Sequence, residues 1–340
     1  MGSFREVVPG GRRAASGASL ALGDRLFRGV TGAGALAVLV LFALLAYVVL
    51  EASSASLQQF GLGFLWGTVW NANPPAAPGQ PPIVFGALPF IDGTLVTAAL
   101  AMLIGIPISL GVAIFLSELS PTWLRGPISL VVELLAAVPS IIYGLWGFFY
   151  LRPIMQGAIE PWLAQHLGPL PIVGGLFLPS PSGILGLDKL TAGVILAIMV
   201  IPTISAIARD AFLAVPTDQR EAAFSLGATG WETTWLSVIP FARKGVLGGI
   251  TLGLGRAVGE TIAVTFLIGN DNHLTSSLLA PGQSIASWIA TEFTVAQLSL
   301  EKSALLELAF VLLVISLVIN VAARLLISGG RLGRRAEASA

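Results

Sequence analysis

Long apolar runs are the feature that most limits what this chain can fold into. They lie at about 30–50, 93–116, 127–151, 190–208, 245–269 and 304–323. The charged residues within them are Glu133, Arg256, Glu260 and Glu307. Each run is close to the ~20 residues that a helix needs to cross a bilayer. Because only a helix satisfies its own backbone groups in lipid, the sequence predicts an all-α membrane protein with six transmembrane helices.

Composition agrees with a lipid environment. Only 11% of the 340 residues are charged, whereas a soluble domain carries roughly 25%. The net charge of zero does not favour nucleic-acid binding, and the absence of cysteine excludes disulfides and thiolate metal sites. The first run could belong to a signal peptide, but its 21 uncharged residues exceed the roughly 7–15 of a signal-peptide core. A retained helix is therefore expected.

The basic residues predict how the chain crosses the membrane. Most of them fall before the first run, after the last run and in the loops 117–126 and 209–244. By the positive-inside rule, both termini and the 209–244 loop are expected in the cytoplasm. The sequence therefore divides into a basic tail at 1–29, a transmembrane domain at 30–327 and a second tail at 328–340.

The 209–244 loop has the pattern of a helical hairpin. Thr217 is predicted to cap a short helix that continues through Leu226, and Gly227 to end it in the left-handed conformation. Thr229 and Glu232 then have the spacing of a capping box for a second short helix. We expect a helix, a glycine turn and a helix between two membrane spans.

Two interpretations of the hairpin are open. Pro240 is expected to end the second helix. On the first helix, Ala222, Ala223 and Leu226 form a small apolar patch beside Glu221. An amphipathic hairpin of this kind could lie on lipid headgroups. It could equally dock a cytoplasmic partner, because small side chains let another surface approach closely.

Arg256 and Glu260 are the unusual residues of the run 245–269. On a continuous helix Arg256 would lie about 16 Å from the start of the run, near the middle of a ~30 Å hydrocarbon core. Glu260 would follow one turn later on the same face. One interpretation is a structural Arg–Glu pair; the other is an anion station, because a guanidinium offers oxyanions a planar fork of donors. The candidate pathway residues are Arg256, Glu260, Gly253 and Thr261.

The hairpin also carries a known motif. Residues 221–223 read E-A-A, and Gly227 and Pro240 follow at the spacings of the signature of ABC-importer permeases, a family that this chain resembles. Ser237 departs from the signature, which has a hydrophobic residue there. The resemblance implies that this loop inserts a helix into a cleft of the ATPase subunit. The implied coupling residues are Glu221, Ala222, Ala223, Leu226 and Gly227.

Three further segments narrow the resemblance. "FGALPFIDGTLVTAA" (85–99), "LLAAVPSIIYGLWGFFYL" (134–151) and "GLGRAVGETIAV" (253–264) resemble the C-type permease of phosphate-specific transporters. The A-type sister typically reads GETAPL where this chain reads GETIAV. The resemblance covers roughly residues 85–325. An A-type phosphate permease and a permease for sulfate or molybdate are the alternatives within the same class.

The resemblance implies a type I ABC-importer permease fold with a cytoplasmic coupling helix, in a multi-pass protein of the bacterial plasma membrane. The implied partners are an A-type sister permease, two cytoplasmic ATPase subunits, an extracytoplasmic phosphate-binding protein, inorganic phosphate and the lipid bilayer. The implied subunit is not an enzyme, and it needs no cofactor of its own. ATP and Mg²⁺ would bind the ATPase, and this chain has no P-loop signature.

Two other classes fit the sequence less well. An intramembrane enzyme would need reactive residues within the spans, but His166 and His273 both fall in predicted outer loops. A secondary transporter would also keep charges at mid-membrane, often in inverted repeats, but no repeat is visible in this sequence. Dependence of transport on ATP would separate a secondary transporter from an ABC importer.

Overall fold

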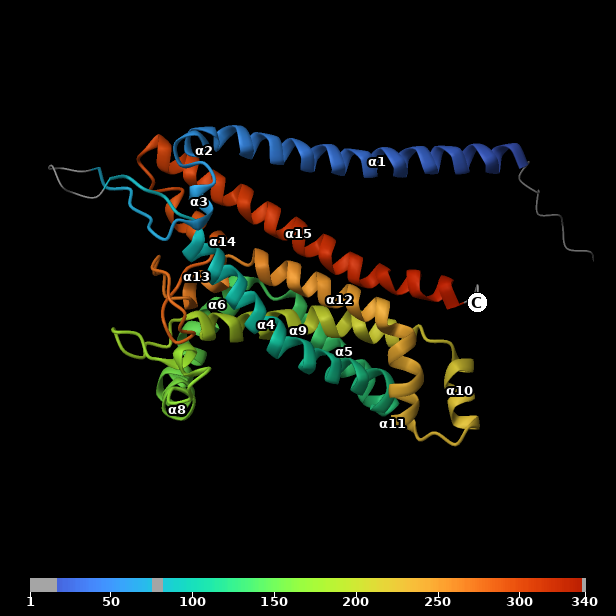
Figure 1. Ribbon diagram of the computed structural model, residues 1–340. Helices are drawn as coiled ribbons and strands as arrows, with labels where there is room; N and C mark the ends of the chain where they lie inside the picture. Colours follow the sequence, from blue (N-terminus) through green and yellow to red (C-terminus); the bar gives the residue numbers. More distant parts are fainter. Residues whose placement is uncertain (1–16, 75–81, 338–340) are drawn as a thin grey trace, which may run out of the picture. The chain divides into compact units, whose positions relative to one another are not determined.

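The computed structural model describes residues 17–74 and 82–337, and these are helical apart from loops and three isolated β-bridges (Figure 1). The chain divides into two compact units, residues 1–51 and 52–340. The described element of the first unit is α1 (Gly17–Ala52), whose last residue begins the second unit. The predicted all-α fold class is confirmed for the described residues.

The second unit contains every other described element. Its α-helices are α2 (Ser54–Phe60), α3 (Gly63–Trp66), α4 (Leu88–Ile114), α5 (Thr122–Ala137), α6 (Ser140–Trp146), α7 (Arg152–Ile154), α8 (Glu160–Leu167), α9 (Lys189–Leu213), α10 (Thr217–Ser225), α11 (Gly230–Thr233), α12 (Ile239–Gly259), α13 (Ile262–Leu267), α14 (Ile285–Glu292) and α15 (Ser299–Glu337). The π-helical segments are η1 (Phe115–Leu119), η2 (Gly147–Leu151), η3 (Met155–Ile159) and η5 (Thr234–Val238), and η4 (Gly174–Phe177) is a 3-10 helix.

Helices occupy all six predicted runs, but not all as single rods. Those long and apolar enough to cross a membrane by length and composition are Asp24–Ala52, Leu88–Leu119, Lys189–Leu213 and Ser299–Leu325. A fifth crossing is possible if Thr122–Ala137 and Ser140–Leu167, which meet at 93°, form one bent span. α1 and α15 extend beyond the predicted spans into the predicted tails. Residues 1–16 and 338–340 of those tails lie outside the described part of the chain.

The third run is broken rather than merely kinked at Pro139. Val138 is extended, with φ −65° and ψ 128°, because the residue before a proline avoids the helical region. α6 therefore starts in a new direction. The hydroxyl of Tyr143 donates to the carbonyl of Leu135 at 2.8 Å, which satisfies one of the acceptors that the end of α5 leaves free.

Helix α9 forms the centre of the second unit and packs against α4 and α12. Three glycines of α12, Gly245, Gly249 and Gly253, make the contact with α9 close. A Cβ at any of them would lie 2.5 to 3.1 Å from the nearest side-chain atom of α9. We call this contact the glycine seam. A Cβ at Gly245 or Gly253 would lie closer than the 3.0 Å that real Cβ atoms keep, and one at Gly249 would force its neighbour to shift by a few tenths of an ångström, so the seam favours residues without a side chain.

Two buried carboxyl groups meet at the end of the bundle opposite α10 and α11 (Figure 1). Asp188 caps α9 by accepting from the backbone N–H of Thr191 at 2.8 Å, and the Thr191 hydroxyl donates to Glu160 at 3.0 Å. Asp188 and Glu160 are 1% and 0% exposed. Burial, followed by the neighbouring Glu160 charge, raises the pKa of Asp188 to about 8. Near neutral pH, Asp188 therefore keeps its proton.

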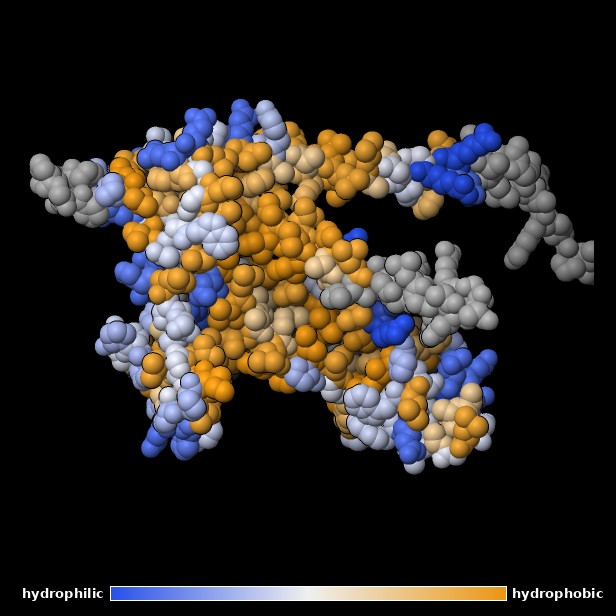
Figure 2. All heavy atoms as spheres, viewed as in Figure 1, coloured by the Kyte–Doolittle hydropathy of each residue, from blue (hydrophilic) through white to orange (hydrophobic). Residues whose placement is uncertain are grey.

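The surface of the second unit matches a membrane protein. On the face drawn in Figure 2, hydrophobic residues cover the long helices, and hydrophilic residues gather at the two ends. One end carries α10 and α11, and the other carries α8 and the neighbouring loops (Figure 1). This distribution positions the α10–α11 hairpin outside the apolar band.

Candidate functional site

The predicted hairpin is present. α10 ends at Ser225, and Gly227 has φ +85°, the left-handed conformation that the sequence predicts for it. Thr229 caps α11 with a complete capping box: its backbone N–H donates to Glu232 at 2.8 Å, and its hydroxyl accepts from the Glu232 N–H at 3.3 Å. The backbone N–H of Thr229 lowers the pKa of the Glu232 carboxyl. The hairpin of α10 and α11 is thus closed by local hydrogen bonds.

Three details of the hairpin prediction are wrong. Thr217 is not the cap, because Pro216 precedes α10 at that position and makes no side-chain cap bond. Leu226 lies just outside the helix that was expected to include it. Pro240 does not end the second helix, since α11, η5 and α12 are continuous. A proline ring clashes with the carbonyl four residues earlier in an α-helix, and here that residue, Leu236, lies in the wider π-helical turn η5.

A groove of about 500 Å³ runs between α10 and the η5 side of the hairpin. Its lining residues are Gln219, Ala222, Ala223, Leu226, Gly227, Ala228, Glu232, Leu236 and Ser237. The structure therefore brings Ala222, Ala223, Leu226 and Gly227 together along one groove. Glu221 is exposed beside it. Leu226 is 90% exposed, so the groove carries an apolar side chain that points to solvent.

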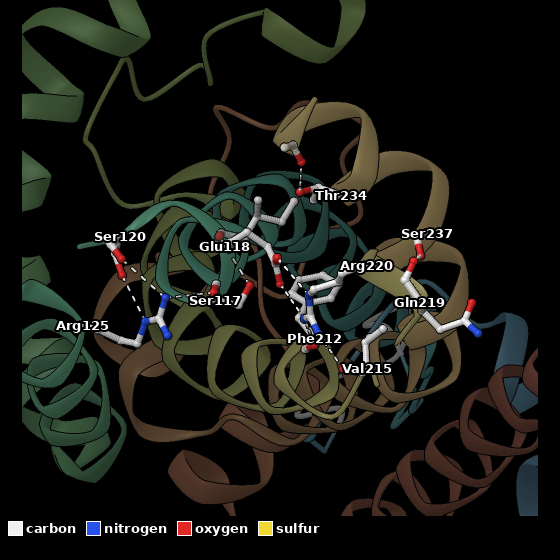
Figure 3. Close-up of polar contacts among 12 residues, drawn as sticks. Ser117, Glu118, Ser120, Arg125, Phe212, Val215, Gln219, Arg220, Thr234 and Ser237 are labelled. Carbon is white, nitrogen blue, oxygen red and sulfur yellow. Dashed lines mark hydrogen bonds and ion pairs between the residues drawn. The ribbon is translucent and has the colours of Figure 1, made fainter. Parts of the chain in front are cut away.

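Gln219, Leu236 and Ser237 are groove residues that sequence reasoning missed as a group. They also line an adjoining hollow of about 420 Å³, which continues to Arg243 and Lys244. The Ser237 hydroxyl donates to the Gln219 carbonyl at 2.9 Å and so ties η5 to α10 (Figure 3). The signal was in the sequence, because Ser237 is the position where the permease signature has a hydrophobic residue.

The run that contains Arg256 and Glu260 is also broken, which corrects the expectation of one continuous helix. α12 ends at Gly259, and Glu260 is extended, with φ −70° and ψ 131°. Thr261 then precedes α13. Glu260 accepts from the backbone N–H of Ala263 at 3.4 Å, so its carboxylate belongs to the start of α13. Arg256 and Glu260 therefore do not lie one turn apart on the same face of a helix.

Arg256 has no ion-pair or hydrogen-bond partner for its side chain among the residues that the structure describes. It is half-buried. α6 packs on α13, where Gly144 lies close to Ala263 and Phe266. The two broken runs are therefore neighbours.

Gly253, another candidate pathway residue, lies in the glycine seam. It is buried, and a Cβ there would come within 2.6 Å of the Ile204 side chain of α9. The position therefore allows α9 to approach α12. Thr261, in contrast, is only half-buried and lies within the second break. Among the described residues, no group of three His, Cys, Asp or Glu side chains could hold a metal ion.

Comparisons with known proteins identify the family of this chain. Residues 105–329 match the family described as "Binding-protein-dependent transport system inner membrane component". The phosphate transport system permease protein PstC of Xylella fastidiosa (strain Temecula1) is 46% identical over 322 residues, 94% of each chain. PstC of Pasteurella multocida (strain Pm70) is 49% identical over 304 residues, 89% of this chain and 91% of that one. The chain belongs to this permease family, in the PstC group.

A solved structure agrees with the fold. The crystal structure of a bacterial ABC transporter involved in the import of the acidic polysaccharide alginate aligns with a TM-score of 0.56 at 15% identity, covering 90% of this chain and 97% of that one. At that identity the likeness concerns the fold alone. With the family match, it confirms the predicted ABC-importer permease fold and a multi-pass inner-membrane protein.

Proposed function

We propose that this chain is the C-type permease subunit of an ATP-driven phosphate importer and forms half of its pathway. The near-full-length similarity to PstC proteins carries this proposal, since those relatives are named for phosphate transport. The function requires an A-type sister permease and an extracytoplasmic phosphate-binding protein. It also requires two cytoplasmic ATPase subunits, which bind ATP and Mg²⁺. Both termini and the α10–α11 hairpin face the cytoplasm.

The α10–α11 hairpin is the proposed docking site for one ATPase subunit. α10 buries none of its own residues, so its surface is available to another chain. Ala222 and Ala223 leave room along the groove, and the exposed Leu226 offers an apolar side chain to a partner's cleft. Removing such side chains from water stabilises a complex by roughly 25 cal/mol per Å² of apolar surface.

Arg256 is the proposed contact for phosphate inside the membrane. Broken helices are tolerated there only where protein or a water-filled cavity covers the freed backbone groups. A guanidinium keeps its charge when desolvated and offers phosphate two parallel donors. The missing ion pair between Arg256 and Glu260 favours this role over a structural clamp.

The decisive experiment measures phosphate uptake by the assembled complex in liposomes, with the binding protein on one side and ATP on the other. Uptake should require ATP hydrolysis, and excess sulfate or molybdate should not compete. If either oxyanion were the preferred substrate, the phosphate assignment would fail. If uptake continued without ATP, a secondary transporter would replace the ABC importer.

Variants of Arg256 and Glu260 test the pathway. If the two residues only neutralise each other, Arg256→Gln combined with Glu260→Gln should transport normally, because removing both members of a buried pair is often neutral. We expect instead that the double variant assembles but does not transport. Arg256→Lys should be partly active, since it keeps the charge but loses the fork. Wild-type uptake by the double variant would reduce both residues to a structural role.

A further inference from the structure

Arg220 of α10 lies where three elements meet. Its Nη2 donates to Glu118 Oε1 in η1 at 3.0 Å and to the Phe212 carbonyl of α9 at 2.8 Å. Its Nε donates to Glu118 Oε2 at 3.4 Å, and its Nη1 donates to the Val215 carbonyl. Figure 3 shows the guanidinium between the Glu118 carboxylate and these carbonyls. The side chains of Arg220 and Glu118 are only 20% and 14% exposed.

The contacts of Arg220 with Glu118 and with the carbonyls of Phe212 and Val215 have a fixed geometry. The last carbonyls of a helix have no partner within that helix, and a cation near them is favourable. A carboxylate that receives two N–H groups of one guanidinium is held in a fixed orientation. Arg220 therefore joins the end of α9 and the end of α4, which continues into η1, through one planar group.

Little else among the described side chains joins α10 to those helix ends. α10 has no buried residue, and it contributes nothing to the apolar cluster beneath it. That cluster consists of Ala113, Ala208, Phe212, Val215, Val238, Ala242 and Val246. On its other side, α10 is tied to η5 by the Ser237–Gln219 bond. A displacement of α10 can reach α4 and α9 directly through Arg220 or through the chain itself at Pro216, and indirectly through η5 and α12.

We propose that Arg220, held by Glu118, is the positioning residue that transmits movement of α10 to α4 and α9. The proposal rests on the function proposed above, in which α10 docks the ATPase. Arg220 touches neither phosphate nor ATP in this role. It makes the docking helix and the ends of two membrane helices move together, so that ATP hydrolysis is coupled to transport.

Arg125, which Figure 3 also shows, provides a matched control for Arg220. Arg125 donates to the Ser117 carbonyl at 3.1 Å and to Ser120, and thus closes the turn between η1 and α5 (Figure 3). It makes no hydrogen bond or ion pair to α10 among the described residues. Arg125→Ala therefore removes an arginine that contacts η1 without removing the link to α10.

The test measures phosphate carried per ATP hydrolysed, together with the amount of ATPase bound, in the full complex in liposomes. Arg220→Ala should keep the ATPase bound and hydrolysis active, but lower the ratio by about tenfold or more, the effect of losing one hydrogen bond to a charged group. Arg220→Lys should fall between wild type and Arg220→Ala. Arg125→Ala should keep the wild-type ratio.

An unchanged ratio in Arg220→Ala would overturn the proposal. An equal fall of uptake and hydrolysis in Arg220→Ala and in Arg125→Ala would also overturn it, because a purely structural role predicts that pattern. If Arg220→Ala does not assemble, Glu118→Gln decides by the same ratio, since it spares both carbonyl contacts; the ratio should fall, and a wild-type value refutes the link. A wild-type complex that hydrolyses ATP but carries no phosphate would contradict the proposed function instead.

Discussion

Replacing Asp188 by asparagine should make the stability of this protein less sensitive to pH. The folded chain keeps a proton on Asp188 up to about pH 8 because the group is buried beside Glu160. The unfolded chain releases that proton near the ordinary aspartate pKa of about 4. Between those values the folded state binds one proton more than the unfolded state. Its free energy of unfolding therefore falls by about 1.4 kcal/mol for each pH unit of increase.

The magnitude follows from the same relation. From pH 5 to pH 7, this one carboxyl costs the wild-type protein about 3 kcal/mol of unfolding free energy. Asparagine has no proton to hold, so Asp188→Asn should gain that amount relative to wild type over the same interval. The amide can still accept from the Thr191 N–H, because asparagine is also a good helix cap. Comparing Asp188→Asn with wild type therefore isolates the effect of the ionisable carboxyl at position 188.

The assay is thermal unfolding of the purified protein in detergent at pH 5, 6 and 7, for wild type, Asp188→Asn and a control. Asp218→Asn is the control, because it removes an exposed carboxyl on α10, away from the pair. The difference in unfolding temperature between Asp188→Asn and wild type should widen as pH rises, whereas the control should follow wild type. Parallel curves for all three proteins would refute the reasoning.

Three further experiments test other parts of the structure. Ala223→Trp should overfill the groove, so ATPase binding and uptake should fall together while membrane insertion survives; normal complex yield would argue against docking there. The chain has no cysteine, so single cysteines can report topology. Ser225→Cys should react with a membrane-impermeant thiol reagent only from the cytoplasmic side, and Ile172→Cys only from the opposite side. Gly249→Leu should lower the unfolding free energy by about 1–3 kcal/mol through overpacking, measured by denaturation. Gly248→Leu, which faces open space, should not; equal losses would contradict the glycine seam.

Local sequence patterns predicted those structural features that depend on residues close together in the sequence. The E-A-A loop, the left-handed Gly227 and the Thr229–Glu232 capping box involve residues a few positions apart, and all are present. Hydropathy over helix-length windows likewise located the apolar runs. It could not show that Glu260 leaves the helix, because no proline or polar stretch marks that position.

Long-range contacts were beyond local patterns. Glu118 and Arg220 are 102 positions apart, and each alone reads as an ordinary charge at the end of a span. Asp188 and Glu160 likewise belong to separate elements, so no local pattern predicts that the two carboxyl groups are buried together. Pro139 marks the break between α5 and α6, but the 93° angle between the two helices depends on contacts far along the chain, such as that of α6 with α13.

The glycine seam limits how this bundle can rearrange during an alternating-access cycle. Sliding α12 along α9 by one residue would move it about 1.5 Å and rotate its contact face by about 100°. Side-chain-bearing neighbours such as Val246 and Ile250 would then take the places of the seam glycines, where even a Cβ would lie 2.5 to 3.1 Å from the nearest side-chain atom of α9. The close contact therefore favours movement of α9 and α12 together over sliding of one past the other. The helices are instead interrupted at the extended residues Val138 and Glu260.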